Sequence, residues 1–184
     1  MKWRALTTAA IFLASAFTSS DVRSAFQKPS DDVINVDVAT LLLNDQDRSV
    51  LLVLKPHDSG PAAGSAAANV LPLVIGLEEA RSIGVAFQKV PTRRPLSHDL
   101  MKTIIEQYGG SIVSCTITKM EQETFYAELR LKRDGRELTI DCRPSDAIAL
   151  ALRSSAPVLV RRSVMLMHGV DPSKPEKTEK PLKT

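Results

Sequence analysis

The sequence predicts an α+β domain in which a mixed, largely antiparallel sheet packs with about three helices. Strand-like and helix-like segments are mixed along the 184 residues without strict alternation, which argues against a doubly wound parallel sheet. Three consecutive strand-like segments near the middle form a meander, which favours antiparallel pairing. Hydrophobic residues make up 43% of the chain but aromatic residues only 4%, so the core must be built from Val, Leu, Ile and Ala.

The first part of the domain is expected to form three strands. Residues 33–43 and 50–55 are rich in Val and Leu, and the turn-forming residues 44–47 separate them. Residues 70–75 form a short apolar run, as in a buried strand, and Gly76 ends it.

Two helices are expected next, at residues 77–88 and 97–108. Their apolar residues recur at helical spacing, and Ser97 is a suitable cap for the second helix. The sequence Gly109-Gly110 would end it. The residues expected to face inward are Ala80, Ile83, Phe87, Leu100, Ile104 and Ile105.

The meander follows, with strands at residues 112–120, 124–132 and 136–142. Asp134-Gly135 is a favoured two-residue hairpin turn between the last two strands.

The two cysteines, Cys115 and Cys142, lie on the outer strands of this meander. The strands would be about 9–10 Å apart, beyond disulfide reach, so both residues are predicted to be free thiols. No CxxC motif accompanies them, and a cysteine-bound metal is therefore not expected.

A strand-to-helix corner at residues 141–152 is the most informative segment. Pro144 stops the strand, and Ser145 is expected to cap a helix at residues 146–154, before a final strand at 157–160. Asp141 and Asp146 could share a divalent cation there, with Arg143 on a phosphate oxygen. Alternatively, Asp141 pairs with Arg143 along the strand and Asp146 serves only the helix dipole.

His98 and Asp99 are the other candidates for proton transfer. His98 is one of three histidines in the chain and could act as a general base. The consecutive residues Ser97, His98 and Asp99 cannot form a catalytic triad, because neighbouring helical residues point about 100° apart. The alternative interpretation is an ordinary helix N-terminus, with Asp99 complementing the dipole.

Basic residues could contact a nucleic-acid backbone. Arg94 follows Arg93 in the loop before the second helix, and a second basic run lies at residues 130–136. For residues 132–136, a solvated strand face and hairpin tip is the favoured interpretation. Glu78 and Glu79 could add a carboxylate to a metal cluster if their helix start faces Asp141, but the favoured interpretation is that they serve their own helix dipole.

Four motifs in this order resemble the bifunctional nuclease domain family, across residues 33–160. They are LPLVIG at 71–76 followed by EEA at 78–80, RPLSHDL at 94–100, FYA at 125–127 and DCRPSDAIALAL at 141–152. A loop of small residues at 59–69 departs from the family pattern. The resemblance implies an α+β domain and, for some members, hydrolysis of both RNA and DNA.

The resemblance therefore favours a nuclease that hydrolyses phosphodiester bonds of RNA, DNA or both, assisted by a divalent metal ion such as Mg²⁺ or Mn²⁺. Asp141 and Asp146 would bind the cation, and His98 or Asp99 would activate water. Arg94 and Arg143 would bind the phosphate and stabilise the transition-state charge. The alternative is a non-catalytic module that binds a protein partner or an anionic ligand at the same corner.

The ends of the chain are expected to lie outside this domain, which would span residues 26–163. Residues 1–25 combine a basic start with an uncharged apolar run at 5–17, which favours a secretory signal peptide over an organellar transit peptide. We therefore expect an exported protein, periplasmic or extracellular, with no stable membrane insertion after signal removal. Residues 164–184 are expected to form a flexible charged tail. The net charge of +3 neither requires nor excludes a nucleic-acid partner, and an oligomer is left open.

Overall fold

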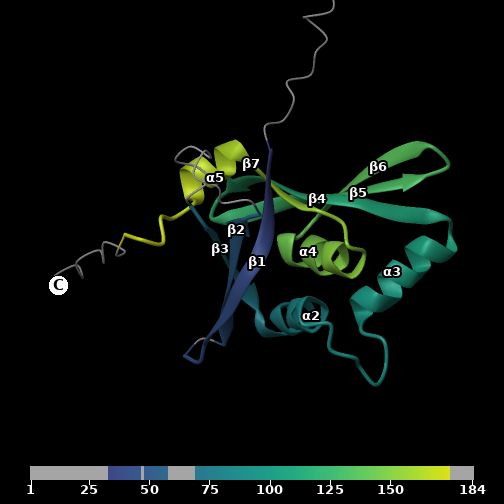
Figure 1. The fold of residues 1–184 in the computed structure, drawn as a ribbon, viewed down its shortest axis with the longest axis horizontal. Coiled ribbons are helices and arrows are strands. Elements are labelled where there is room, and N and C mark those ends of the chain that lie inside the picture. Colours follow the sequence, from purple (N-terminus) through teal and green to yellow (C-terminus); the bar gives the residue numbers. More distant parts are fainter. Residues whose placement is uncertain (1–32, 47, 58–68, 175–184) are drawn as a thin grey trace, which may run out of the picture. The chain divides into compact units, whose positions relative to one another are not determined.

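The computed structural model describes residues 33–46, 48–57 and 69–174, and the predicted α+β class is confirmed in this part (Figure 1). Seven strands form one sheet in the order β3-β2-β1-β7-β4-β5-β6. In chain order the strands are β1 (Val33–Asn44), β2 (Ser49–Pro56), β3 (Leu71–Gly76), β4 (Gly110–Glu121), β5 (Thr124–Arg133), β6 (Arg136–Cys142) and β7 (Val158–Arg161). The described helices are α2 (Leu77–Phe87), α3 (Ser97–Gln107), α4 (Pro144–Arg153) and α5 (Arg162–His168).

The last strand, β7, joins two antiparallel groups of strands. It pairs antiparallel with β1 and parallel with β4, and every other neighbouring pair in the sheet is antiparallel. The β6–α4–β7 connection supplies the crossover that a parallel pair requires. The start of α4, which carries the charged corner, therefore follows β6 directly, and this helix contacts α2, α3 and the sheet.

The core lies between the sheet and helices α2 and α4. Helix α2 packs on β1, β2 and β3, helix α4 packs on β4 and β5, and the two helices contact each other. Alternate strand residues such as Leu52, Leu73 and Ile117 are buried against them. The buried hydrophobic side chains are aliphatic apart from Cys115 and Met165, as the low aromatic content predicts.

Helix α4 begins earlier than predicted, and its cap differs. Pro144 occupies the first helical position, which suits a residue without an N–H, and Arg143 precedes it in extended conformation. Ser145 is buried inside the first turn and makes no capping hydrogen bond, so the predicted Ser145 cap is wrong. Ser97 is likewise the first residue of α3, and Leu96 stands at its cap position.

Helix α3 presents a different face to the protein from the one predicted. Leu100 and Ile104 are 56% and 49% exposed, whereas His98 is only 8% exposed. Hydrogen bonds between His98 and both Ser82 of α2 and Asp146 of α4, and from Arg153 of α4 to Asp99, fix the helix in this rotation. A polar network, rather than the apolar stripe, therefore decides how α3 packs. Phe87 of α2, also predicted to face inward, is 44% exposed.

Residues 162–168 form α5, which the sequence did not predict. Val164 and Met165 of this helix are buried, and Val170 pairs with Val70 beside β3. The chain is thus packed on the domain as far as residue 170, whereas the sequence predicts that the domain ends at residue 163. The proposed signal segment at 1–25 and residues 175–184 of the proposed tail lie outside the described residues, as does most of the small-residue loop at 59–69.

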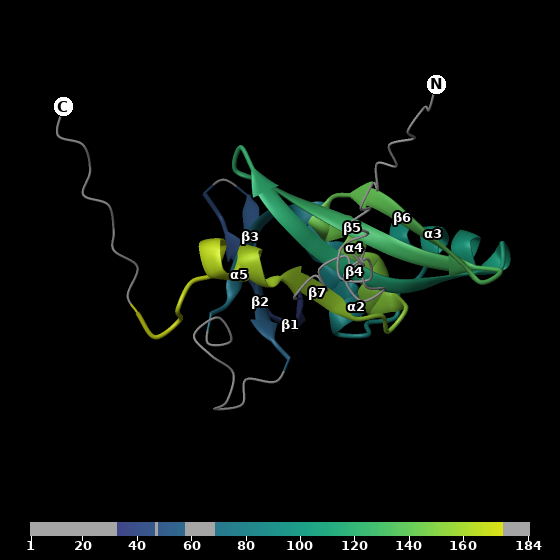
Figure 2. The same cartoon turned by 90° about the horizontal axis from the view of Figure 1, so that it is seen from above.

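The arrangement of the two cysteines is confirmed. Strand β5 separates β4, which holds Cys115, from β6, which holds Cys142 (Figure 2). Both thiols are free. The turn at Asp134-Gly135 is also confirmed, because both residues have the positive φ that a tight hairpin turn of this type needs. None of the described helices has the length and apolar character needed to cross a membrane.

Candidate functional site

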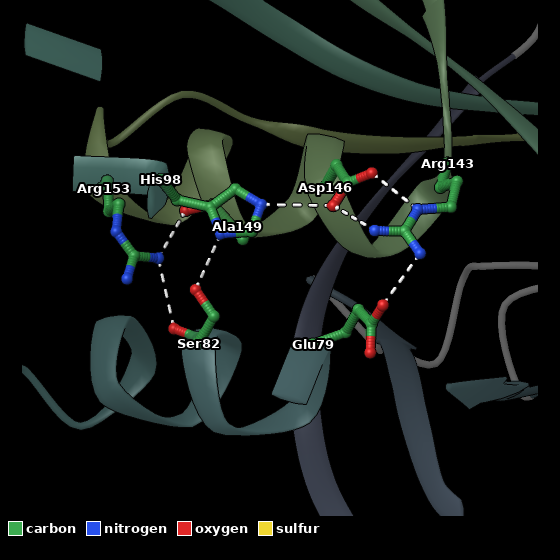
Figure 3. Close-up of polar contacts among 7 residues, drawn as sticks. All are labelled: Glu79, Ser82, His98, Arg143, Asp146, Ala149 and Arg153. Carbon is green, nitrogen blue, oxygen red and sulfur yellow. Dashed lines mark hydrogen bonds and ion pairs between the residues drawn. The ribbon is translucent and has the colours of Figure 1, made fainter. Parts of the chain in front are cut away.

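A cluster of charged side chains forms where the N-terminal turns of α2 and α4 meet. Arg143 donates from Nε and Nη2 to the two carboxylate oxygens of Asp146, at 2.8 and 3.0 Å. Its Nη1 donates to Oε1 of Glu79 at 2.8 Å (Figure 3). Arg143 is therefore held by two carboxylates from different helices, while 65% of its side chain stays exposed.

A chain of hydrogen bonds leads from this cluster into the protein. Oδ1 of Asp146 lies 3.2 Å from Nε2 of His98, and Nδ1 of His98 lies 2.8 Å from Oγ of Ser82 (Figure 3). His98 and Ser82 are both buried. An ionised Asp146 can only accept, so Nε2 of His98 must carry a proton; a neutral His98 then accepts at Nδ1 from the Ser82 hydroxyl.

Asp99 belongs to a second, adjacent ion pair. Arg153 donates from Nε to Oδ1 of Asp99 at 2.6 Å and from Nη1 to the carbonyl oxygens of Ser82 and Ala149. The backbone N–H of Leu96 donates to the other oxygen of Asp99 at 2.7 Å. Arg153 is almost completely buried, so this pair fixes α3 against α2 and α4 beneath the cluster.

The environment keeps both aspartates ionised. Burial opposes ionisation of Asp146, but the hydrogen bonds from Arg143 and His98 and the positive charge of Arg143 lower its pKa below the ordinary 3.8. Burial likewise opposes ionisation of Asp99, and the contacts with Arg153 and Leu96 outweigh it, so its pKa is also lowered. The hydrogen bond from Arg143 to Asp146 and their attraction, followed by the contact with Glu79, raise the pKa of Arg143.

Two clefts meet at this cluster. One, of about 360 Å³, is lined by Ser82, His98, Asp146 and Arg143, together with residues of the α2 and α3 starts. The other, of about 1000 Å³, is largely apolar and runs along β3 and the end of the β4–β5 hairpin. Arg143 and Glu79 line both clefts, so one bound molecule could contact the charged cluster and the apolar cleft together.

The structure brings together three of the residues predicted from sequence: His98, Arg143 and Asp146. Asp141 stands opposite Glu128 across β6 and β5. Because Ala127 and Leu129 are buried on the helix side, Glu128 and Asp141 lie on the other face of the sheet.

The two remaining predicted residues do not join the cluster. Asp99 forms an ion pair with Arg153. Arg94 is exposed in the loop between α2 and α3. The sequence suggests Glu79 as a metal ligand only if the start of α2 faces Asp141, and this condition is not met, because Glu79 contacts Arg143 instead.

Sequence reasoning missed Ser82 and Arg153. Ser82 lies between Ala80 and Ile83 on the buried side of α2, and Arg153 ends an otherwise apolar helix. A polar residue on an apolar helical face is the signal that could have drawn attention to each of them.

The donors in this cluster do not fit a resident metal ion. In the part of the chain that the structure describes, no three His, Cys, Asp or Glu side chains converge as ligands around one point. Both oxygens of Asp146 accept hydrogen bonds from Arg143, and one also accepts from His98. Asp141, its predicted co-ligand, lies outside the hydrogen-bonded cluster.

These features define an α+β domain with an arginine–carboxylate–histidine cluster at a cleft. The bifunctional nuclease domain model matches residues 63–173, which is more than half of the chain. The chain therefore belongs to the bifunctional nuclease domain family, as its motifs indicate.

Relatives of this chain include bacterial and plant proteins. An uncharacterized protein of Mycobacterium tuberculosis (strain H37Rv) is 37% identical over 100 residues, which are 54% of this chain and 59% of the relative. Bifunctional nuclease 1 of Oryza sativa subsp. japonica is 26% identical over 142 residues, 76% of this chain and 41% of the rice protein. Bifunctional nuclease 2 of the same plant is 32% identical over 104 residues, 55% of this chain and 32% of that protein.

Proposed function

We propose that this domain hydrolyses phosphodiester bonds of nucleic acid at the cleft beside Arg143. Family membership and the names of the rice relatives support a nuclease. The observation that carries the proposal is the hydrogen-bonded series Arg143–Asp146–His98, in which an exposed guanidinium leads to a buried imidazole at one cleft. Cationic donors beside a proton-accepting side chain are what hydrolysis of a phosphodiester requires.

Arg143 would bind a non-bridging oxygen of the scissile phosphate. A guanidinium has five N–H donors, and three of them are engaged by Asp146 and Glu79. Two donors are left for the phosphate, and the two carboxylates keep the planar group oriented.

His98 would act as the general base. Asp146 is held ionised by its lowered pKa and by its hydrogen bonds, which makes it a poor proton acceptor. The lone pair at Nδ1 of neutral His98, which accepts the Ser82 hydroxyl, is the better base, and Ser82 would relay the proton to it or rotate away. The water oxygen bonds to phosphorus, its proton goes to His98, and the ester oxygen that leaves takes a proton from solvent. Asp146 would stabilise the resulting imidazolium.

The apolar cleft would receive the nucleotides next to the scissile bond. Its lining includes Phe125 and His168, whose rings meet edge to face at 5.8 Å. Apolar and aromatic side chains beside a phosphate-binding group suit nucleic-acid bases, which bind aromatic surfaces with little sequence preference.

We also expect the reaction to need a divalent cation that arrives with the nucleic acid. Arg143 lies between Glu79 and Asp146, so these three groups carry one net negative charge, which repels a phosphodiester. A counter-ion bound to the substrate would offset that charge, although the protein donors form no resident site of their own.

The test is digestion of labelled single-stranded and double-stranded RNA and DNA by the purified chain, with Mg²⁺, with Mn²⁺ and with a chelator. We expect cleavage that the chelator stops. Absence of cleavage of every substrate with either ion would contradict the proposal and favour the alternative, a module that binds an anionic ligand at Arg143. Cleavage that persists in chelator would contradict only the expected need for a cation.

A further inference from the structure

A second surface of the domain is apolar and has no partner among the described residues. It consists of exposed side chains on α3 and β6, with Tyr108 70% and Leu138 58% exposed. Both views place α3 at the β6 end of the sheet (Figures 1 and 2). We call it the α3–β6 surface; its members are Leu100, Ile104, Tyr108, Leu138 and Ile140.

The helix contributes a continuous stripe to this surface. Leu100, Ile104 and Tyr108 follow one another at four-residue spacing, so they lie on one side of the helix. His98, which faces the catalytic cluster, lies on another side. A groove of about 760 Å³ separates the C-terminal half of α3 from the β5–β6 hairpin, and Ile104, Tyr108 and Leu138 line it.

Strand β6 adds an open sheet edge. It is the last strand of the sheet, and residues 136–141 are all exposed. The two-residue turn makes Arg133 and Arg136 a hydrogen-bonded pair, so alternate residues from Arg136 onward bond to β5. The backbone groups of Glu137, Thr139 and Asp141 therefore point away from the sheet, where they can pair with another strand.

We propose that a second copy of this chain occupies the α3–β6 surface, with the two β6 strands paired antiparallel. A two-fold axis perpendicular to the sheet would extend it across both copies and keep their helix faces on the same side. Leu138 and Ile140 of both copies, and the stripes of both α3 helices, would then meet on that side. One symmetric contact thus satisfies the open backbone groups and buries the apolar side chains together, which favours a second copy over an unrelated partner.

The charges on β6 argue against one of the possible registers. An axis through Thr139 would place Glu137 opposite Asp141 of the other copy, and like charges directly opposite are destabilising. An axis through Leu138 places Glu137 opposite Thr139 and sets the two Leu138 side chains face to face. In this register Leu138 forms a pair without hydrogen bonds, with Cα atoms about 4.5 Å apart.

Analytical ultracentrifugation of the full chain over a range of concentrations tests the proposal. We expect a species of twice the 20.1 kDa of one chain. Ile104→Glu and Leu138→Lys should each shift it to the monomer. Val74→Lys, on the opposite edge strand β3 and 73% exposed, is the matched control and should leave the dimer intact. A monomer at all concentrations, or a dimer that only Val74→Lys disrupts, would overturn the proposal.

A cross-linking variant tests the register and does not depend on the charged substitutions folding. Leu138→Cys should form a disulfide between two copies under mild oxidation, because paired residues without hydrogen bonds come within disulfide reach. Leu43→Cys, a similarly exposed residue of β1, is the control and should stay monomeric on a non-reducing gel. Equal cross-linking of both variants, or none of Leu138→Cys, would contradict the proposed pairing.

Discussion

His98 and Asp146 are 48 positions apart in the chain, yet Nε2 of one lies 3.2 Å from Oδ1 of the other. This contact joins α3 to α4, and the bond from Ser82 to the other ring nitrogen joins both helices to α2. One imidazole therefore connects three helices and also leads to the exposed Arg143. The same side chain has a structural role and a proposed catalytic one, and these can be separated by experiment.

Replacing His98 with Gln should remove catalysis while preserving part of the hydrogen bonding. Gln keeps polar groups for Ser82 and Asp146 but cannot act as a base near neutral pH. We expect digestion to fall by about 10²–10⁴-fold with a small decrease in Tm. His57→Gln, in an exposed pair with Asp37, is the control and should digest as the wild type does. A variant that loses activity only in proportion to its unfolded fraction would show that His98 is purely structural.

Replacing Arg143 with Lys should weaken substrate binding more than folding. Lys keeps the charge but cannot bond two oxygens of Asp146 and one of Glu79 while presenting donors to a phosphate. We expect kcat/KM to fall at least about tenfold, because a bidentate charge-assisted contact is lost. Arg130→Lys, which changes an exposed ion pair with Glu137, provides the comparison. Equal kcat/KM for the two variants would exclude Arg143 from phosphate binding.

The Asp99–Arg153 pair should make stability depend on pH in the acidic range. The folded-state pKa of Asp99 is lowered, so its stabilisation is present above the unfolded value and is lost as the pH falls through the folded one. Asp99→Asn should cost about 2–3 kcal/mol at pH 7, because it leaves the buried Arg153 without its carboxylate.

Urea denaturation at pH 7, 5 and 3 measures this effect. The difference between wild type and Asp99→Asn should shrink below about pH 5, as the wild-type carboxylate becomes protonated. Asp134→Asn, at the exposed hairpin turn, is the control and should show little difference at any pH. A difference for Asp99→Asn that is constant from pH 7 to 3 would contradict the ion-pair account.

Gly84 in α2 and Gly76 directly before this helix should respond differently to replacement by Ala. Gly84 is inside the helix and a Cβ there would meet Leu41 at an ordinary 3.8 Å, so Gly84→Ala should stabilise by about 0.5–1 kcal/mol. Gly76 precedes the helix, and a Cβ there would collide with the Glu79 carboxylate that holds Arg143. Gly76→Ala should therefore lower digestion. Thermal unfolding and digestion rate of both variants check this, and a fully active Gly76→Ala would contradict it.

Local patterns predicted most of the fold. Turn residues at Asp134-Gly135, the stop at Gly76 and the apolar runs of the strands each carry their own signal, so the elements and the meander could be found. Helix α5 could not be predicted, because it is a short helix with polar residues at both ends. It is held by the tertiary contacts of its buried residues Val164 and Met165.

The site was only partly predictable, for the same reason. Charged residues clustered at residues 141–146 indicated a corner. Which of them face one another depends on which face of the sheet each strand residue points to, and on how α2 and α3 approach the corner. Because side chains alternate along a strand, Asp141 lies on the face of the sheet away from the helices. Helix α2 contributes Glu79 and Ser82 to the cluster. The apolar residues of α3 predicted the wrong inward face, since hydrogen bonds of His98 and Asp99 outweigh a half-exposed stripe.

The most direct test of the proposed site compares Asp146→Asn with Asp141→Asn, measuring digestion rate and Tm on the same preparations. Asp146 holds both Arg143 and His98, whereas Asp141 lies on the other face of the sheet. We expect Asp146→Asn to lose at least about 10²-fold in rate while remaining folded, and Asp141→Asn to digest at close to the wild-type rate. A folded Asp146→Asn with full activity, or a loss confined to Asp141→Asn, would contradict the account.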